Sequence, residues 1–286
     1  MQWWCGLCLL AALNLFAWDR AARWLHRHWP VLPAQVRRAC RWQLVLSAGY
    51  VSGCAYRCVF PVVDIPRRTL VDSWLSSVLV GRSVATLAEV CFALQWALLL
   101  WRLAQNGRLA RLGALALVPL IIAAEICSWY AVLTTSNAGH VIEESLWALG
   151  AAVVLLAGSA ILSGDRDAPR SLLAVICIAA GAYLAYLCLV DVPMYWVRWS
   201  ADRALGRYGL SLGRGVLDAL TRRTVSYRWQ DWRSEVPWMS LYFGAGVWTS
   251  LALIRLPALL ARRRARRYGI TGSQTALAVV PLRKTF

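Results

Sequence analysis

Long apolar runs separated by short arginine-rich connections constrain this chain more than any other feature of its sequence. A run of about 18 or more apolar residues can cross the hydrocarbon core of a bilayer as a helix. We find seven such runs, at residues 3–18, 42–63, 74–101, 112–134, 141–163, 171–195 and 236–256. Because the bilayer core offers the backbone no hydrogen-bond partner, these runs predict an all-α fold, a polytopic bundle of about seven transmembrane helices.

The composition supports membrane insertion and excludes a nucleic-acid-binding protein. Hydrophobic residues make up 59% of the 286 residues, and the chain contains 17 tryptophans, a side chain that favours the membrane–water interface. The formal net charge of +17 could indicate nucleic acid as a partner. The arginines, however, flank the apolar runs instead of forming one stripe, so we expect the lipid bilayer as the partner and no nucleic acid.

The same arginines predict the orientation of the helices. When the runs are threaded in order, the basic connections near residues 19–41, 102–111 and 164–170 and the cluster Arg262–Arg267 fall on one side. An excess of arginine in short loops marks the cytoplasmic side. We therefore predict an outside N-terminus and a cytoplasmic C-terminus, in a bacterial inner (plasma) membrane. The first run lacks the basic flank of a cleaved signal peptide, so we expect it to be retained as a helix.

We predict one transmembrane domain over residues 1–268 and a poorly ordered cytoplasmic tail over 269–286. The longest connection, residues 196–235, lies outside in this threading. Apolar side chains recur in it at helical spacing, at Leu205, Tyr208, Leu212, Val216 and Leu220. That pattern is typical of an amphipathic helix lying along the membrane surface, and a solvated connector is the alternative.

Ionisable side chains inside the apolar runs mark the candidate functional region. A charge deep in lipid costs about 2.5–3.5 kcal/mol on insertion scales, so such side chains face a protein interior or a wet cavity. All of them fall in the outer half of the threaded bundle: Arg57, Arg82, Glu89, Glu125, Glu143, Glu144 and Asp191. We therefore expect a hydrated pocket that opens outward. Arg82 and Glu89 are two helical turns apart on one face, and we expect them to share a partner without bonding directly.

The carboxylates and the imidazole of this region suggest three chemistries. We assign Glu125, His140, Glu143, Glu144 and Glu89 as candidate catalytic residues, with Glu125 and Glu144 as an acid–base pair. His140, Glu143 and Glu144 are spaced i, i+3 and i+4 on one helix, a candidate site for a divalent metal cofactor. A proton or ion relay is the third use. The alternative is that these groups form ion pairs that only fix helix packing.

Further side chains complete the predicted pocket. We expect arginines to hold an anionic group of the substrate, and the candidates are Arg57, Arg67, Arg68 and Arg82. The sixth run contributes Tyr183, Tyr186 and Asp191. Cys5 and Cys8 form a C-x-x-C pair, which membrane thiol oxidoreductases use. No nearby charge would activate these thiols, so we favour a packing role for them.

These features favour a membrane enzyme that acts on a lipid or another amphipathic substrate at the outer leaflet. A transporter or proton-coupled carrier is the second hypothesis. It needs a polar route through the cytoplasmic half, where Gln95 is the main candidate. A structural or assembly protein, with charges that serve packing alone, is the third.

Overall fold

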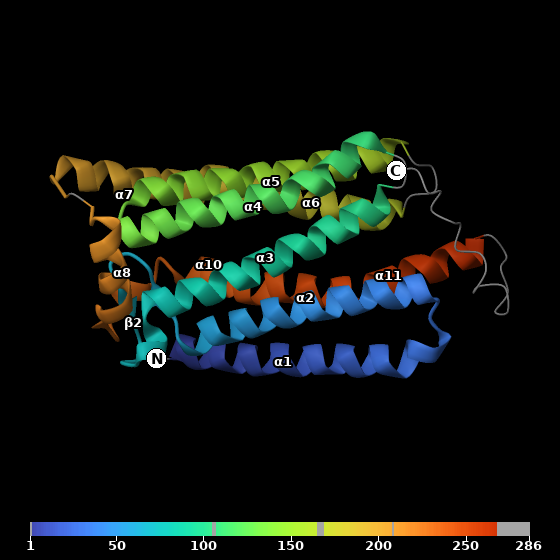
Figure 1. Ribbon diagram of the computed structural model, residues 1–286, viewed down its shortest axis with the longest axis horizontal. Helices are drawn as coiled ribbons and strands as arrows, with labels where there is room; N and C mark the ends of the chain where they lie inside the picture. The colour runs from blue at the N-terminus through green and yellow to red at the C-terminus, as the bar shows by residue number, and fades with distance from the viewer. Residues whose placement is uncertain (1, 105–106, 165–168, 208, 268–286) are drawn as a thin grey trace.

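The computed structural model describes residues 2–104, 107–164, 169–207 and 209–267. The tail predicted at 269–286 lies outside the described residues. Five long helices come first: α1 (Gln2–His28), α2 (Ala34–Val59), α3 (Val78–Leu103), α4 (Arg108–Thr134) and α5 (Asn137–Gly164). A short 3-10 helix, η1 (Trp29–Val31), turns the chain between α1 and α2. These helices run side by side along the long axis of the molecule (Figure 1).

Two further rods each contain a π-helical stretch. The first is α6 (Arg170–Tyr186), which continues through η3 (Leu187–Asp191) into α7 (Val192–Ala204). The second is α10 (Val236–Leu241), which continues through η4 (Tyr242–Gly246) into α11 (Val247–Arg267). π-Helical turns are rare and occur often at functional sites.

The structure confirms the predicted all-α membrane bundle. Six helices of the described chain are long and apolar enough to cross a membrane: α1, α3, α4, α5 and the two π-interrupted rods. α2 is as long as these helices but more polar, because Arg37, Arg38 and Arg41 fall in its first turns. It nevertheless packs between α1, α3 and α11 as part of the bundle. The number of spans and the side that faces the cytoplasm stay predictions.

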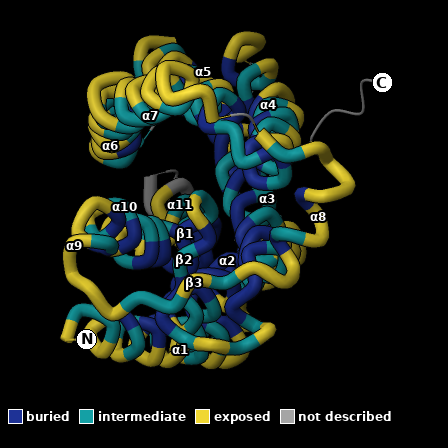
Figure 2. The backbone as a smooth tube through the Cα atoms, turned by 90° about the vertical axis from the view of Figure 1, so that its left-hand side faces the viewer, coloured by how far each residue is buried: buried dark blue, intermediate teal, exposed yellow. Residues whose placement is uncertain are grey.

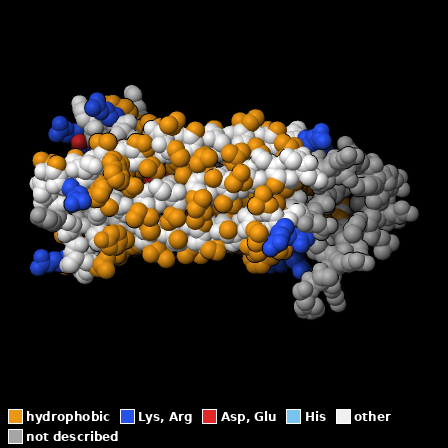
Figure 3. Space-filling view, turned by 90° about the horizontal axis from the view of Figure 1, so that it is seen from above, with side chains coloured by type: hydrophobic (Ala, Val, Ile, Leu, Met, Phe, Trp, Pro, Cys, Tyr) orange, Lys and Arg blue, Asp and Glu red, His pale blue; other side chains and the backbone are white. Residues whose placement is uncertain are grey.

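The outer surface of the bundle is apolar along its middle. Large hydrophobic side chains on this surface are more than half exposed, and examples are Leu9, Leu87, Leu115, Ile126, Leu156 and Ile178. Figure 3 shows such side chains spread over one long face, with arginine side chains gathered toward the two ends. An apolar surface this extensive fits contact with lipid.

The helices divide into two groups that α3 connects. α1, α2 and α11 pack together around a core that includes Leu7, Tyr50, Phe243 and Ile254. α5 packs against α4 on one side and against α6 and α7 on the other. Figure 2 looks along the bundle and shows α6 and α7 set apart from α10 and α11. At one end the groups meet in a second core, which includes Leu100, Leu117, Leu173 and Leu253.

The opposite end carries a cap that the sequence did not predict. Three two-residue strands form a sheet in the order β1 (Val62–Val63), β2 (Arg68–Thr69) and β3 (Thr224–Val225). β1 and β2 pair antiparallel, and β2 and β3 pair parallel. The cap also contains η2 (Trp74–Ser76), α8 (Leu212–Thr221) and α9 (Trp229–Trp232). The second helix therefore ends at Val59, and the third begins at Val78, where the Ser77 hydroxyl accepts from the Val80 amide.

α8 falls within the connection for which an amphipathic helix was one of two interpretations. Gly215 and Ala219 face inward, and α8 packs on α4 and α3. Its other face is apolar and exposed, at Leu212, Val216, Leu217 and Leu220. α8 and α4 approach each other closely at Gly215. A Cβ added there would lie only 1.9 Å from the carbonyl oxygen of Leu133.

Candidate functional site

Arg82 is surrounded by carboxylates from three helices. Its Nη2 lies 3.0 Å from Oε2 of Glu89 on the same helix, 2.7 Å from Oε2 of Glu125 on α4 and 3.2 Å from Oε1 of Glu143 on α5. All four residues are more than nine-tenths buried. The expectation that Arg82 and Glu89 would not bond directly is wrong, because their long side chains span the two turns between them.

Hydrogen bonds extend this cluster to both sides. The Thr86 hydroxyl donates to Glu125 (2.6 Å), and Nε1 of Trp129 donates to that hydroxyl (3.0 Å). On α5, Nδ1 of His140 lies 2.7 Å from Oε2 of Glu143. The Tyr195 ring of α7 packs on the His140 ring, with centroids 4.9 Å apart. The cluster therefore draws on α3, α4, α5 and α7.

The cluster contains more negative than positive groups. Three carboxylates face one guanidinium, and a buried charge without a partner is costly. Three of its polar atoms also lack a hydrogen-bond partner among the described residues: Nε of Arg82, Oε1 of Glu125 and Oγ of the neighbouring Ser128. A proton or another cation would balance the excess negative charge.

A cavity of about 810 Å³ opens beside the cluster. Its walls come from α2, α3, α5 and the two π-interrupted rods, and Phe92, Trp96, Leu172, Val175, Leu253 and Leu256 are among its apolar lining residues. Its polar lining residues gather toward the capped end: Arg57, Asp64, Arg82, Glu89, His140, Glu143, Glu144, Tyr183, Tyr186, Asp191, Tyr195, Arg198 and Glu235. The cavity is thus polar at one end and apolar along the rest of its length.

Glu144 is the least constrained carboxylate of this lining. It is half-buried and forms no hydrogen bond or ion pair within the described part of the chain. Its charge acts on Tyr183, Tyr195 and Asp191, which line the same cavity. An ionisable side chain inside a membrane helix without a structural partner is a candidate functional group.

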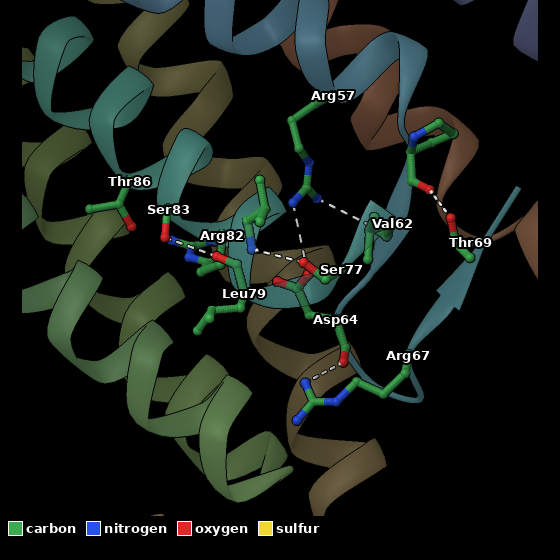
Figure 4. Close-up of polar contacts among 12 residues, drawn as sticks. Arg57, Val62, Asp64, Arg67, Thr69, Ser77, Leu79, Arg82, Ser83 and Thr86 are labelled. Atoms are coloured by element: carbon green, nitrogen blue, oxygen red, sulfur yellow. Dashed lines mark hydrogen bonds and ion pairs between the residues drawn. The ribbon is translucent and has the colours of Figure 1, made fainter. Parts of the chain in front are cut away.

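Arg57, on α2, also lines the polar end of the cavity. Its Nη2 donates to the carbonyl oxygen of Val62 (3.1 Å), and its Nη1 lies 3.8 Å from Oδ1 of Asp64 (Figure 4). That distance is too long for a hydrogen bond, so Nη1 has no hydrogen-bond partner among the described residues although Arg57 is nine-tenths buried.

The structure places most of the predicted site residues together. Glu89, Glu125, Glu143, His140 and Arg82 are in direct contact with one another through the bonds given above. Five further predicted residues line the cavity beside that cluster: Arg57, Glu144, Tyr183, Tyr186 and Asp191.

Two predicted substrate-binding arginines lie in the cap. Arg67 has a fully buried side chain that bonds to Asp218 (2.9 Å) and to the carbonyl oxygens of Asp64 and Val132. Arg68 donates to the carbonyl oxygen of Asp231 and lies 3.8 Å from its carboxylate. The Ser226 hydroxyl donates to this carboxylate and, with Arg68, lowers the pKa of Asp231. Neither arginine lines the cavity.

The side chains that lie close enough to hold a metal ion are not the set that helical spacing predicted. Carboxylate oxygens of Glu89, Glu125 and Glu143 lie within 4.8 Å of one another, close enough to hold an ion. His140 contacts only Glu143 of this group, and Glu144 is outside it. Nη2 of Arg82 already contacts all three carboxylates, so a metal there would require Arg82 to move.

Four polar lining residues were not predicted from the sequence: Asp64, Tyr195, Arg198 and Glu235. Tyr195 and Arg198 follow Asp191 at i+4 and i+7 and so share its helix face, a signal that could have identified them. Nothing in the sequence marked Glu235. Cys5 and Cys8 are free thiols on α1, which contributes no residue to the cavity lining.

Comparison of the chain with known protein families, with curated proteins and with solved structures found no match in any of the three. The fold and the site define a multi-pass integral membrane protein built of helices, with a charged cluster buried beside an internal cavity.

Proposed function

We propose that this protein binds a lipid or another amphipathic molecule in the cavity and acts on its polar end. The observation that carries the proposal is the distribution of the lining, with ionisable groups at the capped end and apolar side chains beyond them. Ligand pockets are mostly apolar with a few well-placed polar groups, and this cavity has both in separate zones.

The size of the apolar zone supports an acyl or similar chain. On α6 the lining extends from Tyr186 back to Leu172, which is about 21 Å at 1.5 Å per residue. That length is more than half of a hydrocarbon core of about 30 Å. A ligand that lies here would keep its chain within the membrane and its polar end beside Glu144.

Proton transfer is the reaction step that the polar zone supports. Glu144 faces the cavity without a structural partner, and the His140–Glu143 pair lies one turn earlier on α5. Groups of this kind serve as general acids and bases when a substrate atom comes within hydrogen-bond reach. The orientation predicted from the arginines would place this reaction at the outer leaflet.

A matched pair of tryptophan substitutions tests the binding step. Ala179 lines the cavity, whereas the adjacent Ile178 points away from it and is 72% exposed. Lipids extracted from purified protein would be quantified by mass spectrometry. Ala179→Trp should remove a lipid that co-purifies with the wild type and with Ile178→Trp. The same bound lipid in all three proteins would contradict the proposal.

The reaction step needs its own test. Wild-type protein in lipid nanodiscs would be incubated with a bacterial polar-lipid extract, and the lipids would be followed by mass spectrometry. Glu144→Gln keeps the shape of the side chain and should stop any conversion that the wild type carries out. Asp19→Asn, at an exposed site on α1, is the control for the loss of one charge. Full conversion by Glu144→Gln would remove Glu144 from the reaction.

The carrier hypothesis receives less support, because the predicted polar candidate of the other half is fully engaged. Nε2 of Gln95 donates to the side chain of Gln43 (3.0 Å), and Oε1 of Gln95 accepts from the Ser250 hydroxyl (2.6 Å). These bonds fasten α3 to α2 and α11. Uptake of a solute into proteoliposomes would revive this hypothesis.

A further inference from the structure

The charges of the cavity lining are unevenly paired. Six carboxylates line it with three guanidinium groups and one imidazole. Arg57 faces Asp64, Arg198 pairs with Glu235 at 3.2 Å, and Arg82 pairs with Glu89 and Glu143. Glu144 and Asp191 are left without an ion pair among the described residues. Both line the cavity, so its polar end presents two carboxylates that take part in no close ion pair of the described chain, although Arg198 is near Asp191.

Aromatic rings lie next to these two carboxylates. Tyr186 lies near Asp191, Tyr183 lines the cavity near Glu144, and Trp147 follows Glu144 by about one turn on α5. Ring faces attract cations, most strongly where water is excluded. One ring of the cavity lining already contacts a cation: the guanidinium carbon of Arg198 lies 5.4 Å from the centroid of the Tyr195 ring. Carboxylates and rings together favour an ammonium group.

Arg57 provides a complementary feature. Its Nη1 has no hydrogen-bond partner among the described residues, whereas the guanidinium group of Arg82 already contacts three carboxylates. The Arg57 side chain is nine-tenths buried and lines the cavity. A buried N–H group without an acceptor is costly, so an oxygen acceptor on a bound molecule would stabilise it. Oxyanions are the acceptors that guanidinium groups bind best.

We propose that the ligand has a zwitterionic head that carries both an ammonium group and an oxyanion such as a phosphate ester. Glu144, Asp191 and the adjacent rings hold the ammonium group, and the free N–H group of Arg57 holds the oxyanion. A purely anionic head would meet the unpaired carboxylates, and a purely cationic head would leave the N–H group of Arg57 without an acceptor. This inference rests on the proposed binding of an amphipathic molecule in the cavity.

Four amphiphiles that share a dodecyl chain and differ only in the headgroup test which head the cavity prefers. Dodecylphosphocholine, dodecyl phosphate, dodecyltrimethylammonium and dodecyl maltoside would be titrated, each below its micelle concentration, into wild-type protein held in an amphipathic polymer. The phosphocholine should bind roughly tenfold more tightly than each of the others, a ratio that corresponds to about 1.4 kcal/mol. Equal affinities, or a preference for the phosphate or the maltoside, would overturn the inference while leaving the cavity as a binding site. Binding of none of the four would overturn the proposed function as well.

Variants identify the groups that make the selection. Glu144→Gln should abolish the preference for the phosphocholine over the phosphate, and Asp191→Asn should weaken it. Asp19→Asn, which removes an exposed carboxylate of α1 outside the lining, should leave the order of affinities unchanged. Retention of the full preference in both cavity variants would contradict the assignment. If Glu144→Gln fails to fold, Asp191→Asn and the ranking in the wild type still decide the question.

Discussion

Arg198 on α7 forms an ion pair with Glu235, the residue before α10, across 3.2 Å. The pair joins the two π-interrupted rods at the polar end of the cavity that they line. Glu235 is fixed from its other side as well, because Nε1 of Trp238 donates to it at 2.7 Å. The two rods pack mainly on different neighbours, α6 and α7 on α5, and α11 on α1, α2 and α3, and they meet again in the core that contains Leu173 and Leu253.

This pair should control how fast an amphiphile enters the cavity. Glu235→Gln removes the charge and keeps the side-chain shape, so the two rods should separate more easily. Arg198 is about a third exposed, and such pairs contribute up to about 1 kcal/mol, so we expect an access rate up to roughly fivefold faster. Stopped-flow fluorescence with a labelled single-chain amphiphile would measure the rate. Arg207→Gln, which removes a more exposed pair with Asp202, is the control. An unchanged rate would show that the rods do not open at this end.

Replacement of Arg82 should destabilise the protein severely. Arg82→Met leaves three buried carboxylates without their cation, and the loss of one partner of a buried ion pair costs about 3–5 kcal/mol. The thermal midpoint in detergent should therefore fall strongly, whereas Arg38→Ala on the exposed face of α2 should change it little. Adding Glu143→Gln to Arg82→Met should recover part of the loss. A double variant no more stable than Arg82→Met would contradict the charge imbalance derived for the cluster.

Two glycines of α8 give a test of the cap with an internal control. A Cβ at Gly215 would collide with the backbone of Leu133, whereas a Cβ at Gly213 meets nothing within 4 Å. Gly215→Ala should push α8 away from α4 and lower the thermal midpoint. Gly213→Ala should be neutral or stabilising by up to about 1 kcal/mol, the difference in helix propensity between the two residues. Equal midpoints for the two variants would show that α8 is not held by this contact.

The polar cluster around Gln95 should act as a clamp at the other half of the bundle. Gln95→Leu removes the donor to the Gln43 side-chain oxygen and carbonyl oxygen, and leaves the Ser250 hydroxyl with Ser47 alone. Each buried group left without a partner costs about 1–3 kcal/mol. Thermal unfolding of Gln95→Leu should start at a lower temperature than that of Gln35→Leu, an exposed position on α2. Similar unfolding of the two variants would argue against the clamp.

The sequence predicted the bundle and much of the cavity lining for a common physical reason. Long apolar runs have few stable alternatives to helices in a bilayer, and charges inside them have to face inward. Arg82, Glu125 and Glu143 were therefore expected in one region, where the structure brings them into contact. Helix periodicity alone also placed Arg82 and Glu89 on one face.

The cap escaped prediction because its contacts join short segments far apart in the chain. Arg67 pairs with Asp218, 151 residues away, and its strand neighbours are only two residues long. Such segments carry no periodic pattern that sequence reasoning could detect. The same holds for Glu235, whose partner Arg198 comes from a separate helix. The arginines of the cap therefore looked like ligand-binding groups, although Arg67 and Arg68 bond to the chain itself.

The π-helical stretches η3 and η4 have a consequence for how the cavity can change in evolution. Each stretch accommodates one residue more than regular α-helical geometry would hold. Deleting a single residue from η4 would allow a continuous α-helix to form while α10 and α11 kept their faces. The change would fall on the lining residues of the stretch itself, such as Tyr242, Phe243 and Gly246. Small insertions and deletions at these two points could therefore remodel the pocket without rebuilding the bundle around it.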